Sequence, residues 1–174
     1  MKTVFSSSST FQLLNHLWLM LISFLAHGVL SQSIVSPDFS FQPKDRIALV
    51  GDTLLEREQT WGYLETAITA RHPAHDLVFR NFAWSGDNPL GQSRASFDWS
   101  KPKEQWVQRI TRELEAFEPT VLLLGYGMAS SLELPNQTRA FRDELVALIE
   151  ACRAVSKKPA DLRVVLLSPM RHEA

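Results

Sequence analysis

The chain has 174 residues, of which 45% are apolar and 21% are charged, and its formal net charge is −1. This size and composition fit one globular domain with a buried core. They exclude a disordered chain, which would carry fewer apolar and more charged residues. The near-neutral charge, without a Lys/Arg-rich run, excludes a general nucleic-acid binder. The single cysteine, Cys152, excludes an internal disulfide and a cysteine-based metal cluster.

Residues 1–31 differ from the rest of the chain and predict a signal peptide. Lys2 is their only charged residue, and residues 17–26 form an apolar run. A membrane span needs roughly 20 residues, whereas a run of about ten has the length of a signal-peptide core. Small residues predict cleavage after Ser31, with Gly28 as the second choice. We therefore expect an exported protein, periplasmic or extracellular, without a membrane span after cleavage; an uncleaved N-terminal anchor is the alternative.

A polar, proline-bounded linker at residues 32–43 precedes a domain that we expect at residues 44–174. Continuous apolar runs predict strands at residues 47–50, 77–79, 120–124 and 162–167. Apolar residues spaced three and four apart predict helices at residues 54–71, 103–117 and 138–155. Strands that alternate with helices predict an α/β fold, a three-layer flavodoxin-like parallel sheet with helices on both faces.

The loops that follow the strands carry the candidate site, because ligands of such sheets bind beyond the carboxyl ends of the strands. Residues 51–55 read GDTLL, residues 81–87 read NFAWSGD, and residues 125–130 read GYGMAS. In this order and behind these strands, the three loops resemble those of the SGNH (GDSL-type) hydrolase family.

The resemblance implies the SGNH hydrolase fold and a reaction on ester bonds, in an acyl ester or an acetylated carbohydrate. It places Thr53 at the position of the nucleophilic serine and assigns the N–H of Gly86 to the oxyanion hole. It places Ala129 at the position of the family's asparagine, the second oxyanion donor. Asp52 and Gly127 are expected to contact the ligand, a small-molecule ester or carbohydrate. No metal or organic cofactor is implied.

The sequence departs from the family pattern at three points. Thr53 keeps a hydroxyl group, but its extra methyl group restricts χ1. Ala129 has no side-chain donor. No histidine stands three residues after an aspartate, so the family's Asp-x-x-His acid–base pair is missing. We therefore expect a hydrolase domain truncated after its fourth strand and inactive as this chain. A non-catalytic ester- or carbohydrate-binding relative is the alternative, and a flavodoxin- or receiver-like signalling domain is a third.

The candidate site residues also have purely structural interpretations. Thr53 or Asp52 is equally suited to cap the first helix, because both residue types are preferred N-caps. Gly86 with Asp87 and Asn88 fits plain turn chemistry.

Other chemistry-bearing residues outside these loops are weaker candidates. His72 and His75 have the spacing of a metal pair, but they lie in the turn after the first helix, where we expect a surface loop. Trp84 and Trp99 are candidates for a sugar-stacking platform, whereas Trp106 lies on a helix stripe that favours the core. Cys152 is expected to be a buried thiol, and His172 is a poor candidate for the missing base.

Overall fold

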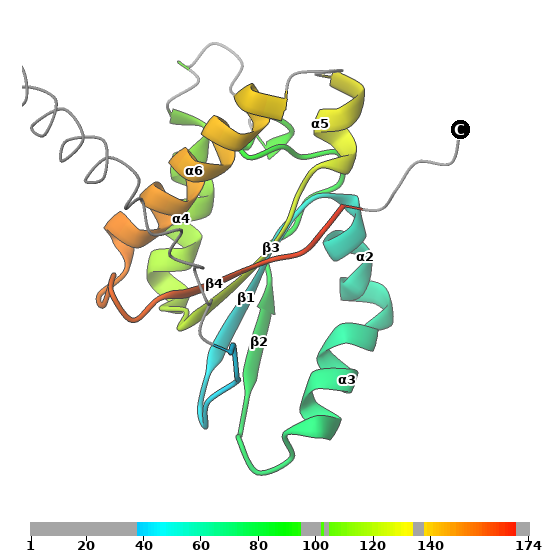
Figure 1. The fold of residues 1–174 in the computed structure, drawn as a ribbon, viewed down its shortest axis with the longest axis vertical. Coiled ribbons are helices and arrows are strands. Elements are labelled where there is room, and N and C mark those ends of the chain that lie inside the picture. The colour runs from blue at the N-terminus through cyan, green and yellow to red at the C-terminus, as the bar shows by residue number, and fades with distance from the viewer. Residues whose placement is uncertain (1–37, 95–101, 103–104, 134–137, 170–174) are drawn as a thin grey trace, which may run out of the picture. The chain divides into compact units, whose positions relative to one another are not determined.

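The computed structural model of the chain describes residues 38–94, 102, 105–133 and 138–169 (Figure 1). The predicted signal peptide, Trp99 and His172 lie outside these residues. The fold concerns the compact unit Ser40–Ala174. Across the described part of this unit, no helix is long and apolar enough to cross a membrane.

Four parallel strands form one sheet in the order β2-β1-β3-β4. Their bounds are Arg46–Gly51 for β1, Val78–Asn81 for β2, Val121–Gly125 for β3 and Arg163–Leu166 for β4. At the carboxyl ends of the two central strands, Gly51 of β1 stands opposite Gly125 of β3. The predicted parallel sheet is confirmed.

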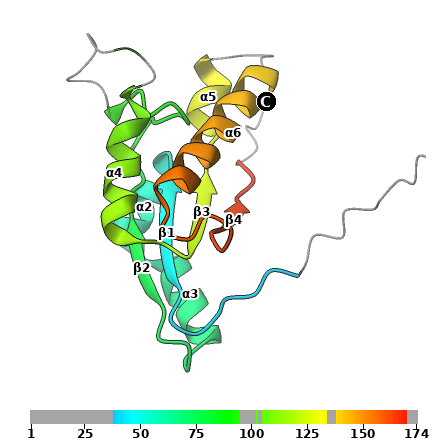
Figure 2. The same ribbon diagram turned by 90° about the vertical axis from the view of Figure 1, so that its left-hand side faces the viewer.

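Helices cover both faces of the sheet (Figures 1 and 2). On one face lie α2 (Thr53–Trp61) and α3 (Tyr63–Arg71), and on the other lie α4 (Val107–Phe117) and α6 (Thr138–Val155). The predicted three-layer arrangement is therefore confirmed. A short helix that the sequence did not predict, α5 (Met128–Glu133), follows β3.

Alternate residues of the central strands supply two cores. Ala48 and Val50 pack with α4 and α6, whereas Ile47 and Leu49 pack with α2 and α3. Because both faces are covered, the central strands read as continuous apolar runs. Burial of each large apolar side chain contributes about 1.5–3 kcal/mol relative to exposure. The edge strands are less covered, and Leu166 of β4 is exposed.

Two residues predicted to be buried on the helices are buried. Trp106, which directly precedes α4, is 9% exposed. Cys152 of α6 packs in the core under α4, and burial raises the pKa of its thiol to about 12. The thiol therefore stays protonated at neutral pH and is a packing group rather than a nucleophile.

The predicted continuous helix at residues 54–71 is wrong, because Gly62 divides it. Gly62 has φ +61° and donates its N–H to Glu58 O, which ends α2 in a left-handed turn. The Glu58 carboxylate then accepts the N–H of Leu64 at 2.7 Å and so satisfies the first turn of α3. The predicted strand at residues 77–79 is also displaced, since β2 runs to Asn81.

The chain crosses from β1 to β2 over one face and from β2 to β3 over the other. The direction in which the chain adds strands to the sheet therefore reverses between β1 and β3. The loops that follow these two strands lead to opposite faces of the sheet at this point. Such a switch point is where open α/β sheets bind their ligands. The loops after Gly51 and Gly125 both begin there.

Candidate active site

Asp52 joins the first and third loops across the switch point. It is 2% exposed, and it caps α2 by accepting the N–H of Leu54 at Oδ1, at 3.3 Å. Its Oδ2 accepts the N–H of Met128, at 3.1 Å, and its own N–H donates to Gly125 O. The capping interpretation is thus correct for Asp52 and wrong for Thr53, which is the first residue of the helix.

Thr53, which follows Asp52 in the chain, contacts Gly86 of the second loop. The N–H of Gly86 donates to Oγ1 of Thr53 at 3.0 Å, although the residues are 33 positions apart in the chain. Thr53 also stands at the positive end of the α2 dipole, where a developing negative charge is stabilised. The predicted convergence of hydroxyl and backbone N–H is therefore observed, while their catalytic roles stay predictions.

The second loop is folded so that the N–H of Gly86 faces Thr53. Gly86 has φ +68°, a left-handed conformation that costs roughly 1–2 kcal/mol for other residues. The loop is anchored on both sides of it: the N–H of Trp84 donates to Gly51 O at 3.0 Å, and Oγ of Ser93 donates to Gly86 O at 2.7 Å. The loop thus holds the donor in place before any ligand binds.

A buried ion pair supports the same loop. Arg94 Nε donates to Asp87 Oδ2 at 2.6 Å, and the two side chains are 4% and 0% exposed. Arg94 also donates to Phe82 O, and Asp87 Oδ1 accepts the N–H of Ser93. Burial raises the pKa of Asp87, and Arg94 opposes that rise. Asp87 also closes the turn that the sequence allowed, because its N–H donates to Trp84 O at 3.1 Å. Its ion pair with Arg94 was missed, because no periodic pattern relates residues within an irregular loop.

In the third loop, Ala129 itself offers no side-chain hydrogen-bond donor. Ala129 is the second residue of α5 and is half-buried, and its match to the family's asparagine position stays a prediction. Gly127 has φ +132°, and a Cβ there would lie 3.0 Å from Cβ of Pro169. Gly127 thus lets the loop pass close to the segment after β4, while the backbone N–H of Met128 is committed to Asp52.

No imidazole stands near Thr53 within the described residues. His72 and His75 lie at the opposite end of the sheet, where His72 ends α3 and His75 O accepts the N–H of Lys44 before β1. Their rings are 4.9 Å apart. In the part of the chain that the structure describes, no group of three or more His, Cys, Asp or Glu side chains could hold a metal ion.

Comparisons with known proteins bear on the fold. No protein-family model and no curated protein sequence matches the chain. Three solved structures are similar to it: the psychrotrophic esterase EstA from Pseudoalteromonas sp. (20% identity, TM-score 0.50), the α/β hydrolase LAE5 from the metagenome of Lake Arreo (15%, 0.50) and a GDSL-like lipase from Parabacteroides merdae (15%, 0.52). They match 73%, 74% and 75% of this chain, respectively.

The chain has the SGNH hydrolase fold. Its structural neighbours are GDSL-like lipases and esterases, as the three loop motifs predicted. The chain spans 62% of the length of each of the three structures. At 15–20% identity the likeness concerns the SGNH fold alone, so activity and substrate must be argued from the residues at the site.

Proposed function

We propose that the chain is part of an exported SGNH-type hydrolase that acts on ester bonds, with Thr53 as its nucleophile. The observation that carries this proposal is the 3.0 Å hydrogen bond from Gly86 N–H to Thr53 Oγ1. An ester bound here would place its carbonyl carbon next to Oγ1 and its carbonyl oxygen toward the N–H of Gly86. The site thus pairs a hydroxyl nucleophile with an oxyanion donor.

In the proposed reaction, Oγ1 of Thr53 attacks the acyl carbon and gives up its proton to a base. As the carbonyl oxygen becomes an oxyanion, the N–H of Gly86 exchanges its hydrogen bond to Oγ1 for one to that oxygen. The C–O bond to the alcohol then breaks, the alcohol leaves with a proton, and water hydrolyses the acyl-threonine. The described residues offer no imidazole as the base, and Ala129 offers no second donor, a loss on the order of 10²–10³ in kcat.

The oxyanion site can be tested without turnover. Monoethylphosphonate, the inhibitor in the EstA structure, carries a tetrahedral phosphorus with anionic oxygens. We expect its titration into ¹⁵N-labelled protein to shift the amide resonance of Gly86. Gly91 is the control, because it also has a positive φ in the same loop but does not face Thr53. An unmoved Gly86 resonance, or equal shifts at both glycines, would contradict the proposed site.

Hydrolysis of p-nitrophenyl acetate tests the nucleophile. We expect the 174-residue chain to be no faster than its Thr53→Ala variant, because a hydroxyl without a base is a weak nucleophile. Thr60→Ala is the control, since Thr60 is an exposed residue of the same helix. Thr53→Ser with Ala129→Asn should not rescue this chain, but should do so in a chain extended through an Asp-x-x-His segment.

Two outcomes would change this proposal. Activity of the 174-residue chain that is lost in Thr53→Ala would show that it contains a base, and His172 would be the first residue to replace. No Thr53-dependent activity in the extended chain would favour a non-catalytic relative that binds esters or carbohydrates. The methyl group of Ala129 at the second donor position favours that alternative.

Export is tested at the N-terminus of the secreted protein. We expect cleavage between Gly28 and Gln32, because small residues follow the apolar run of residues 17–26. N-terminal sequencing of material recovered outside the cytoplasm checks this expectation. A secreted protein that still begins at Met1 would instead favour an uncleaved anchor.

A further inference from the structure

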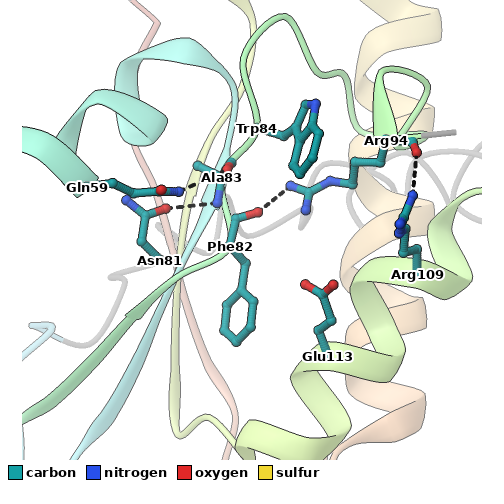
Figure 3. Close-up of a pocket in the computed structure, with 8 residues that line it drawn as sticks. All are labelled: Gln59, Asn81, Phe82, Ala83, Trp84, Arg94, Arg109 and Glu113. Atoms are coloured by element: carbon teal, nitrogen blue, oxygen red, sulfur yellow. Dashed lines mark hydrogen bonds between the residues drawn. The ribbon is translucent and has the colours of Figure 1, made fainter. Parts of the chain in front are cut away.

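A hollow of about 140 Å³ lies beside the candidate site, between the end of β2 and the first turns of α4 (Figure 3). It does not include Thr53 or Gly86. Pockets for drug-sized ligands measure roughly 300–1,000 Å³, so this one suits a single small ring. Its walls come from three separate parts of the chain: Gln59 of α2, Trp84 in the loop after β2, and Glu113 of α4.

Aromatic and polar groups face the hollow from different sides. The Trp84 ring stands over it and is 48% exposed, and the Phe82 ring borders it below (Figure 3). Arg94 forms part of the wall although it is only 4% exposed. Its guanidinium is held by Asp87 and by Phe82 O, so it cannot swing away. The hollow therefore has a rigid polar wall under an accessible aromatic face.

The charges around the hollow balance. Arg94 is neutralised by its buried partner Asp87. Arg109, which donates to Arg94 O at 2.8 Å, stands one helical turn before Glu113 on α4, so one positive and one negative side chain remain. Neither an anion nor a cation is favoured by such a lining. The Glu113 carboxylate has no hydrogen-bond partner among the described residues and is available to accept from hydroxyl groups.

We propose that this hollow binds one neutral sugar ring, stacked on Trp84 and hydrogen-bonded to Glu113 and to the guanidinium groups. Such a ring has an apolar C–H face for the indole, and hydroxyl groups that both donate and accept. A charged ligand would be attracted by only one of the two charged side chains, Arg109 or Glu113, and repelled by the other. Binding requires neither Thr53 nor a base, so the inference goes beyond the proposed ester chemistry and can fail or hold independently of it.

The position of the hollow relates it to the candidate site. Trp84 is two residues before Gly86, and consecutive Cα atoms are about 3.8 Å apart, so the two Cα atoms lie within about 8 Å. The aromatic wall of the hollow and the N–H that faces Thr53 therefore belong to one short segment of the loop after β2. If both proposals hold, the hollow holds the sugar part of an esterified carbohydrate.

Titration with methyl β-xylopyranoside and methyl β-glucopyranoside tests the hollow, with binding followed by saturation-transfer NMR and by protein amide shifts. We expect millimolar affinity and shifts centred on Trp84 and α4. Trp84→Ala and Glu113→Gln should each weaken binding about tenfold. Trp61→Ala is the matched control, because Trp61 is also exposed but lies outside the hollow. It should bind as the parent chain does.

Three results would overturn the proposal. The first is the absence of glycoside binding by the parent chain in the millimolar range. The second is a loss of binding in Trp61→Ala rather than in Trp84→Ala, which would place the sugar on another aromatic surface. The third is competition by inorganic phosphate, which would mark the hollow as an anion site. Both tested side chains are exposed, and equal thermal stability of each variant and parent would confirm that folding is intact.

Discussion

Replacement of Arg94 by alanine is expected to lower the free energy of unfolding by about 3–5 kcal/mol at neutral pH. The substitution leaves the Asp87 carboxylate buried at 0% exposure without its cationic partner. It also removes the donor to Phe82 O, and with it the anchor of the loop that presents Gly86. Urea unfolding at several pH values, followed by circular dichroism, measures the loss.

The loss should depend on pH in a defined direction. Burial raises the pKa of Asp87 while Arg94 lowers it, so removing Arg94 raises that pKa further. A carboxyl group whose pKa is higher in the folded state than in the unfolded state contributes stability when the pH is below its pKa in the unfolded state. This contribution is lost as the pH rises through its pKa in the folded state. The variant should therefore recover part of its stability as the pH falls from neutral.

Two comparisons make the Arg94 prediction specific. Arg112→Ala removes an exposed arginine of α4 and should change stability by less than about 0.5 kcal/mol. Arg94→Ala combined with Asp87→Asn should lose the part of the pH dependence that Asp87 causes, because position 87 then has no titratable carboxyl group. A loss in Arg94→Ala that is the same at acidic and neutral pH would show that the ion pair is not what stabilises the loop.

Gly51→Ala is expected to cost about 3 kcal/mol or more, at the upper end of the range for overpacked cores. A Cβ at residue 51 would lie 2.2 Å from the carbonyl oxygen of Gly125 and 2.8 Å from its carbon. Because these are backbone atoms of the adjacent central strand, no rotamer change relieves the contact. β1 and β3 would have to separate at the switch point, where Asp52 donates its N–H to Gly125 O. Chemical denaturation measures the effect.

Gly125→Ala provides the matched control on the opposite strand. A Cβ at residue 125 would approach the Leu55 side chain, with Cδ1 at 2.9 Å, and a side chain can shift where a backbone cannot. We expect a smaller loss of stability in Gly125→Ala than in Gly51→Ala. Equal losses would indicate that the close approach of the strands is not what requires glycine at residue 51.

Local patterns in the sequence were sufficient for the architecture and for the place of the candidate site. The apolar runs that became β1 and β3 are buried on both faces, so composition alone identified them. Parallel strands send their exit loops to one edge of the sheet, so the order of the three loops predicted that Thr53 and Gly86 would meet. The partly exposed β2 was placed less accurately, because its pattern is weaker.

The break at Gly62 could not be decided from the sequence. Apolar residues on both sides continue one helical pattern, and an isolated glycine is tolerated within a helix. Only packing of α2 and α3 against the sheet determines that Gly62 takes φ +61° and that Glu58 supports the restart. The sequence likewise did not predict α5, because Met128 and Ala129 were assigned to the loop after β3. The hydrogen bond from the N–H of Met128 to Asp52, at the start of α5, forms only in the folded chain.

The sequence by itself determined the α/β class, the order of the elements and the residue types that reach the switch point, because these depend on neighbours along the chain. The tertiary structure alone decided that Arg94 pairs with Asp87, that Asp52 clamps two loops and that Trp84 and Glu113 border one hollow. Those contacts join residues with no common period, and their strength comes from burial, which exists only once the sheet and its helices have packed.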